Sequence, residues 1–113
     1  MYHSHYTLNQ YEVLEVKGEL DCVAVAQRKD LIEAVPATFE EHIVFDLSEV
    51  TFIDSSGIGV IVYLFKRLRE QNRQLIIAGV TGQPKELMKL LRIDRAITIK
   101  DSARSCLYST TEH

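Results

Sequence analysis

Residues 45–60, with the sequence FDLSEVTFIDSSGIGV, contain the stretch that decides the fold. The apolar run at residues 42–47 is typical of a central strand that is buried on both faces. After a loop, the sequence Asp-Ser-Ser (54–56) precedes an apolar segment of helical length, residues 57–71. This order predicts a buried strand that leads into the N-terminus of a helix, where backbone N–H groups are unpaired and the helix dipole is positive.

The flanking segments predict an α/β protein. Residues 3–8 and 13–17 have the composition of two strands joined by a short loop, which indicates an N-terminal hairpin. Helical and strand patterns then alternate, so we expect parallel strands added to this hairpin in one mixed sheet flanked by helices. The further elements expected are helices at residues 22–35 and 82–91, strands at residues 75–78 and 97–100, and a short terminal helix capped by Asp101 and Ser102.

Several boundaries follow from local chemistry. Residues 18–21 are expected to break the second strand, and Asp21 is well placed to cap the helix that follows. Pro36 is expected to end that helix. In the helix at residues 82–91, Pro84 stands early, where its missing N–H is harmless. The leucines expected to share one face of this helix are Leu87, Leu90 and Leu91.

Composition excludes several classes of protein. The 113 residues, 46% of them hydrophobic, predict a single domain over residues 1–113 with one core. A net charge of −3 argues against a nucleic-acid binder. Cys22 and Cys106 form no metal or disulfide pattern, and no signal peptide or membrane-spanning run is present. We therefore expect a cytoplasmic protein that binds neither metal nor membrane.

The Asp-Ser-Ser turn has several possible meanings. All three residues are preferred helix N-caps, so capping alone accounts for them. A lipase-type nucleophile elbow fits poorly because Ile53 replaces the first glycine and none of His3, His5, His42 and His113 follows a late strand. A phosphate loop lacks its Gly-Lys-Ser/Thr sequence. A receiver-type phosphoaspartate at Asp54, with Lys100 after the last strand, lacks the acidic residues that hold magnesium.

The helix that follows the turn is apolar over more than one face. At 100° per residue, one stripe is expected to face the core, and Val60 and Tyr63 fall outside it. Such a helix is either buried on two sides or presents a contact surface. We favour the contact surface, because Ser56 shares this side. The stripe expected in the core consists of Ile58, Ile61, Val62, Phe65 and Leu68.

Taken together, these motifs resemble the STAS domain, specifically the bacterial anti-sigma-factor antagonists. The resemblance covers nearly the whole chain. It rests on Gly-Glu-Leu-Asp at residues 18–21, Phe-Asp-Leu-Ser at 45–48, the stretch at 52–60, and Leu-Leu-Arg-Ile at 90–93. It implies a STAS fold with no cofactor and no catalytic activity.

The resemblance also implies a mechanism. In that family a serine kinase that is also the anti-sigma factor phosphorylates the serine after the aspartate, which is Ser55 here, with Ser56 as second choice. The unphosphorylated form binds this partner and frees the sigma factor, phosphorylation abolishes binding, and a metal-dependent (PP2C-type) serine phosphatase restores it. Alone, the protein is expected to be a monomer. The expected docking surface comprises Asp21, Asp54, Ser56, Gly57, Gly59, Val60 and Tyr63.

Two alternatives remain within the same fold. One is a STAS subunit of a lipid-transport ATPase, in which the serine need not be phosphorylated. The other is a small-ligand-binding STAS domain, although the sequence shows no aromatic box or arginine pair for a nucleotide. An enzyme is less consistent with the sequence, which offers no base, metal cluster or activated nucleophile.

Overall fold

Five strands of the described chain form one mixed sheet in the order β1-β2-β3-β4-β5. The computed structural model describes residues 2–8 and 10–104. The hairpin prediction is confirmed, because β1 (Tyr2–Leu8) pairs antiparallel with β2 (Tyr11–Leu20). The parallel arrangement of the rest is confirmed as well. The strands added to the hairpin are β3 (His42–Ile53), β4 (Leu75–Ala78) and β5 (Thr98–Lys100).

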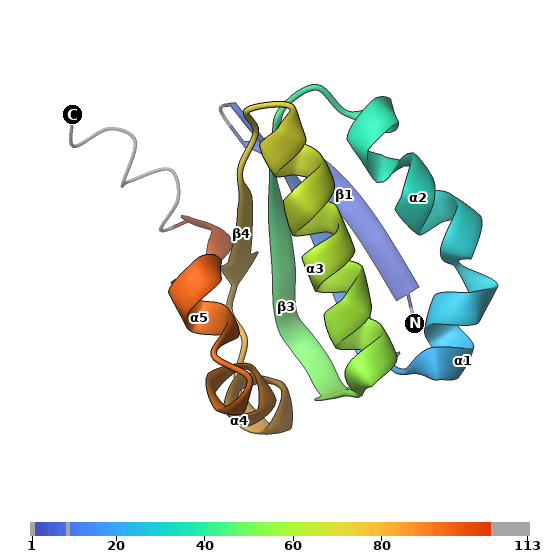
Figure 1. Cartoon of the computed structure of the whole chain (residues 1–113), viewed down its shortest axis with the longest axis vertical. Coiled ribbons are helices and arrows are strands. Elements are labelled where there is room, and N and C mark those ends of the chain that lie inside the picture. Colours follow the sequence, from blue (N-terminus) through green and yellow to red (C-terminus); the bar gives the residue numbers. More distant parts are fainter. Residues whose placement is uncertain (1, 9, 105–113) are drawn as a thin grey trace.

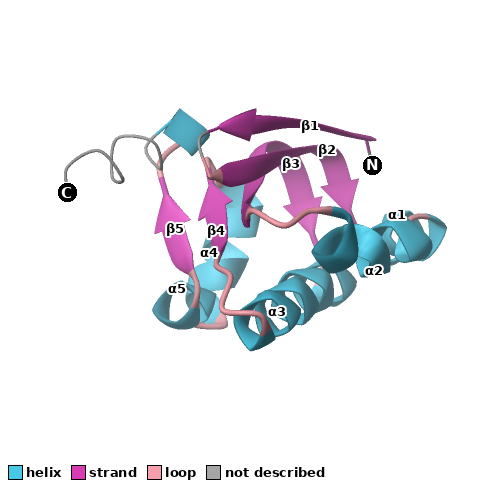
Figure 2. Cartoon of the chain, turned by 90° about the horizontal axis from the view of Figure 1, so that it is seen from above, coloured by secondary structure: helices cyan, strands magenta, loops and turns pink. Residues whose placement is uncertain are grey.

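Helices connect the parallel strands and cover the sheet. The described helices are α1 (Cys22–Gln27), α2 (Lys29–Thr38), α3 (Ser55–Glu70), α4 (Gly82–Leu90) and α5 (Ile93–Ala96). The helices α1, α2 and α3 lie against the same face of the sheet, and α3 runs along β3 (Figures 1 and 2). The main core fills this layer, with Leu14, Ile43, Phe45, Ile61 and Leu64 among its buried members. A smaller cluster on the other face includes Val13, Val44 and Ile76.

The helix expected at residues 22–35 is divided in two. Arg28 lies between α1 and α2 with φ −115° and ψ 14°, and its N–H donates to the Val25 carbonyl. The prediction that Pro36 ends the helix is wrong, because α2 continues to Thr38. Pro36 is buried, and packing of its ring offsets the one backbone hydrogen bond that a proline cannot make.

The strands that lead to the Asp-Ser-Ser turn are longer than the sequence predicts. β3 continues through the expected loop to Ile53, and β2 continues through Gly18 to Leu20. Two register shifts between these strands, at residues 15–17 and 18–19, allow the pairing to continue. Gly18 has φ +88°, a conformation that favours glycine. The two strands therefore end side by side, at Leu20 and Ile53.

The C-terminal third contains two further differences. Of the three leucines expected to share one face of this helix, Leu87 packs against the core, whereas Leu90 is 78% exposed and Leu91, which follows α4, is 49% exposed. Pro84 and Met88 are buried. The short helix α5 was not predicted, and Ile97 is its C-cap rather than part of β5. Most of the expected terminal helix, together with Cys106 and His113, lies outside the described residues.

The first turn of α3 packs directly on the end of β2. A Cβ atom placed on Gly57 would lie 2.4 Å from the Leu20 carbonyl oxygen and 2.5 Å from Ile53 Cγ1. No side chain fits there, so Gly57 sets how closely the helix approaches the sheet. Gly59, two residues later, is exposed, and a Cβ atom on it would meet no atom within 4 Å.

These two glycines form a matched pair for a stability test. We predict that Gly57→Ala lowers the free energy of unfolding by roughly 1–3 kcal/mol, because the helix must move away from Leu20. Gly59→Ala should raise it by about 0.5–1 kcal/mol, since alanine is the better helix former. Urea unfolding followed by circular dichroism measures both. Equal effects of the two substitutions would contradict the close approach at Gly57.

Candidate functional site

One carboxylate joins two helices at the corner where β2 and β3 end. Asp54 is the N-cap of α3, and its Oδ1 accepts hydrogen bonds from the N–H groups of Ser56 (2.9 Å) and Gly57 (3.1 Å). Its Oδ2 accepts from the N–H of Cys22 (2.9 Å), the first residue of α1. Because helix N-termini carry partial positive charge, the Asp54 carboxylate stabilises both.

Two further bonds complete this corner. The Asp54 N–H donates to the Leu20 carbonyl at 3.4 Å, which links the ends of β2 and β3. Asp21 Oδ1 accepts from the Ala24 N–H at 2.9 Å, so the predicted cap of the first helix is confirmed. We call the group Asp21, Cys22, Asp54, Ser55 and Ser56 the Ser55 corner.

The serines are free of the capping role that the sequence left open for them. Ser55 is the first residue of α3 and is exposed, whereas Ser56 is partly buried. Since Asp54 supplies the capping oxygen, the Ser55 hydroxyl lies at the positive end of a sixteen-residue helix without serving as its cap. Asp54 therefore holds the turn, and Ser55 is the residue that the turn exposes.

A groove leads away from the Ser55 corner, with α3 on one side and the end of α1 and α2 on the other; α2 and α3 lie side by side in Figure 1. We call it the α2–α3 groove. Four residues of the expected docking surface line it, namely Ser56, Gly59, Val60 and Tyr63. The opposite wall consists of Val25, Ala26, Lys29, Ile32 and Glu33. Most of the expected docking residues therefore do lie along one continuous region.

Two members of the expected surface are buried. Val60 is only 6% exposed and belongs to the main core, so the prediction that its side chain lies on an exposed face is wrong. Gly57 is buried against Leu20. Tyr63 is partly buried and packs against the core while lining the groove.

The expected core stripe of α3 is rotated from its predicted position. Ile58, Ile61 and Leu68 are buried as expected, but Val62 and Phe65 are only partly buried. Gly57, Val60 and Leu64 are buried in their place. Their spacing of three and four residues is equally helical. The close contact at Gly57, which an apolar count does not detect, decides between the two stripes.

A residue that the sequence does not point to holds the end of the strand before Asp54. Gln83, near the start of α4, accepts a hydrogen bond from the Ile53 N–H through Oε1 and donates one to the Ile53 carbonyl through Nε2, both at 2.9 Å. This pair of bonds replaces a missing neighbouring strand at the end of β3. A glutamine at the second position of a helix gives no sequence signal for such a contact.

Comparison with known proteins identifies the fold and the family. The family model described as STAS domain matches residues 6–106. The chain belongs to the STAS domain family. It is 30% identical over 86 residues to the anti-sigma-B factor antagonist of Listeria monocytogenes, an alignment that covers 76% of this chain and 75% of the relative. The resemblance to bacterial anti-sigma-factor antagonists is therefore confirmed.

Solved STAS-domain structures agree with this fold. An anti-sigma factor antagonist from Mycobacterium paratuberculosis superposes with a TM-score of 0.84 at 20% identity, covering 96% of this chain and 92% of that one. The Bacillus cell fate determinant SpoIIAA in its phosphorylated form superposes with a TM-score of 0.72 at 17% identity, covering 96% and 99%. Among the residues described for this STAS domain, no helix combines the length and apolarity needed to cross a membrane.

The double role of Asp54 in this STAS domain can be tested by one substitution. In Asp54→Asn, the remaining carbonyl oxygen can still cap α3, but an NH₂ group faces the Cys22 N–H. We predict that the free energy of unfolding falls by about 1.5–3 kcal/mol. Amide hydrogen exchange should accelerate at Cys22 more than at Ser56 or Gly57.

Asp46→Asn is the matched control. Asp46 Oδ1 accepts one hydrogen bond, from the Ser48 N–H at 3.0 Å, and asparagine can keep it. Equal unfolding free energies for the two variants would contradict the role assigned to Asp54.

Proposed function

We propose that this STAS domain is an anti-sigma factor antagonist that acts by partner switching in the cytoplasm. In its unphosphorylated form it binds an anti-sigma factor with serine kinase activity and displaces the sigma factor held there. Phosphorylation of Ser55 ends the interaction, and a metal-dependent (PP2C-type) serine phosphatase restores it. The observation that carries the proposal is the exposed Ser55 hydroxyl at the N-terminus of α3, next to a capping aspartate.

The fold is suited to carry a phosphate at this position. Ser55 is exposed, so a phosphoryl group displaces no packed side chain. The N-terminus of α3 favours negative charge, and the hydrogen bonds that start the helix belong to Asp54 rather than Ser55. Phosphorylation is therefore expected to change the surface while the domain stays folded.

The same phosphate is expected to weaken the binding of a docked partner. Phosphorylation adds about −1.5 to −2 charges next to Asp54, whose carboxylate accepts from the N–H of Cys22, the residue that follows Asp21. Burying this charge without a counter-charge costs several kcal/mol through desolvation and like-charge repulsion. Each 1.4 kcal/mol corresponds to about tenfold in affinity, so a modest penalty is enough to release the partner.

The partner surface in this proposal extends from the Ser55 corner along the α2–α3 groove. Two large apolar side chains near the corner are exposed, Val23 (60%) on α1 and Phe52 (40%) at the end of β3. Exposed apolar groups beside a polar switch are typical of a docking surface. Within the groove, Tyr63 contributes an aromatic side chain to the lining, and the buried Val60 lines its base.

The phosphorylation site is tested with serine variants and the cognate kinase. Ser55→Ala should stay folded, bind the partner and accept no phosphate, whereas Ser55→Asp should bind more weakly because it adds charge at the same place. Ser56→Ala is the control and should be phosphorylated normally. Mass spectrometry of phosphopeptides measures the outcome. A phosphate mapped to Ser56, or none at all, would exclude the assignment to Ser55.

The groove is tested by comparing two aromatic residues of α3. Tyr63 and Phe65 are both partly buried and both pack against the core, but only Tyr63 lines the groove. Tyr63→Ala and Phe65→Ala should lower the unfolding temperature by similar amounts. Only Tyr63→Ala should weaken partner binding, by about tenfold, as is common for an interfacial tyrosine. Equal binding by the two variants in calorimetric titrations would place the partner elsewhere.

A further inference from the structure

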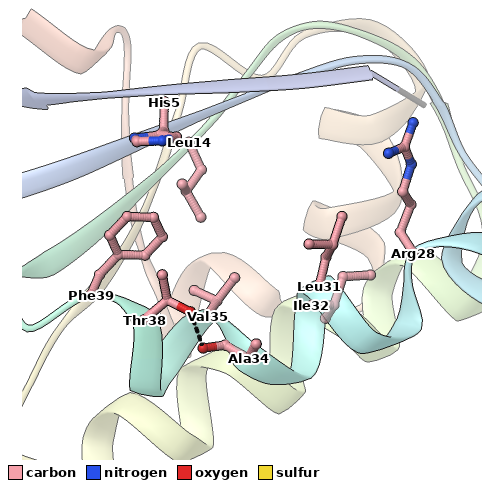
Figure 3. Close-up of a pocket in the computed structure, with 9 residues that line it drawn as sticks. All are labelled: His5, Leu14, Arg28, Leu31, Ile32, Ala34, Val35, Thr38 and Phe39. Atoms are coloured by element: carbon pink, nitrogen blue, oxygen red, sulfur yellow. Dashed lines mark hydrogen bonds between the residues drawn. The ribbon is translucent and has the colours of Figure 1, made fainter.

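A second cavity lies on the other side of α2, away from the Ser55 corner. It has a volume of about 250 Å³ and is enclosed by α2, β1 and β2 (Figure 3). It shares only Ile32 with the α2–α3 groove. The residues that line it are His5, Leu14, Arg28, Leu31, Ile32, Ala34, Val35, Thr38 and Phe39.

The middle of this cavity is apolar. Leu14 projects from β2 toward Val35 of α2 across the space, and Ile32 lies farther along α2 toward Arg28 (Figure 3). Phe39 packs its ring edge-on against His5, with ring centroids 5.3 Å apart. Leu31, which also lines the cavity, is 51% exposed. The cavity thus offers an apolar molecule a partly open site of the kind that binds small ligands.

The two ends of the cavity differ in charge. The Arg28 guanidinium lies at one end, and His5 and Phe39 lie at the other (Figure 3). A guanidinium carries five N–H donors in a planar fork, a geometry that suits a carboxylate. None of the nine lining residues is acidic.

The His5 end is unsuited to an anion. Behind His5 lies Glu12, which is 3% exposed, with its Oε2 2.6 Å from His5 Nδ1. Its Oε1 accepts a hydrogen bond from Thr7 Oγ1 at 2.8 Å. Because the Glu12 carboxylate already lies against Nδ1 of His5, it would repel a second carboxylate at this end, whereas Arg28 would attract one at the other.

We propose that this cavity binds a free amphipathic carboxylate of medium chain length. The carboxylate lies at Arg28, and the hydrocarbon chain runs between Leu14 and Val35 toward Phe39. Such a ligand matches the apolar middle and the single cationic end, and it places no charge near Glu12. This site is separate from the proposed partner surface and does not depend on phosphorylation of Ser55.

The test uses the whole chain and sodium decanoate as the probe, at concentrations below micelle formation. We expect saturable binding in nuclear magnetic resonance titrations, with the largest amide shifts at Leu14, Ile32 and Val35. Arg28→Gln should weaken decanoate binding by about tenfold, as expected for the loss of a charge-assisted hydrogen bond, and leave decanol binding unchanged. Lys29→Gln removes a neighbouring charge that does not line the cavity, and should have no effect.

If Arg28→Gln unfolds the protein, a second pair of variants still tests the cavity. Ala34→Leu fills part of the cavity with a good helix former and should abolish binding, whereas Ala37→Leu, on an exposed position outside it, should not. Binding of decylammonium equal to that of decanoate would overturn the proposal. So would shifts confined to other surfaces, or retention of the protein on phosphatidylglycerol vesicles, which would indicate a membrane surface as the ligand.

Discussion

The bridge that the Asp54 carboxylate makes between the N-termini of α1 and α3 is the interaction on which the rest of this structure depends. Its two oxygens accept three backbone N–H groups from two helices, and its own N–H reaches the Leu20 carbonyl. Two strand ends and two helix starts therefore meet at one residue. Gly57 completes the contact by letting α3 approach β2 at a distance that excludes a Cβ atom. Gln83 fixes the preceding residue from the other side.

Because Asp54, and not Ser55, caps α3, the serine of the proposed switch can lie at the N-terminus of this helix without being needed for its structure. A turn held by Asp54 does not need the Ser55 hydroxyl, so Ser55 can change its charge at little cost to the fold. The positive end of α3 favours the added anion, while the carboxylates of Asp21 and Asp54 make the same anion unfavourable in a buried interface. In the proposed function, the phosphate on Ser55 thus acts on partner binding rather than on folding.

Much of this arrangement could be predicted from the sequence, because it depends on local chemistry. The cap at Asp21, a helix following the strand at the Asp-Ser-Ser turn and the parallel addition of strands to a hairpin all follow from short-range patterns, and the structure confirms them, although α3 begins at Ser55 rather than at the expected residue 57. The differences arise where distant segments decide. The extension of β3 to Ile53 depends on the register shifts in its pairing with β2. The break between α1 and α2 at Arg28 could not be predicted, because no glycine or proline marks it in the sequence. Val60 is buried because Gly57 rotates α3 onto the sheet, a long-range contact that no apolar count reveals.

The central claim is that one phosphate on Ser55 changes binding without changing the fold. Calorimetric titration of the kinase-type anti-sigma factor with unmodified protein and with protein phosphorylated only on Ser55, each with a thermal unfolding curve, tests it most directly. We predict an affinity at least about tenfold lower for the phosphorylated form, with an unfolding temperature that is unchanged or higher. Equal affinities, or a loss of binding that accompanies a large fall in unfolding temperature, would contradict it.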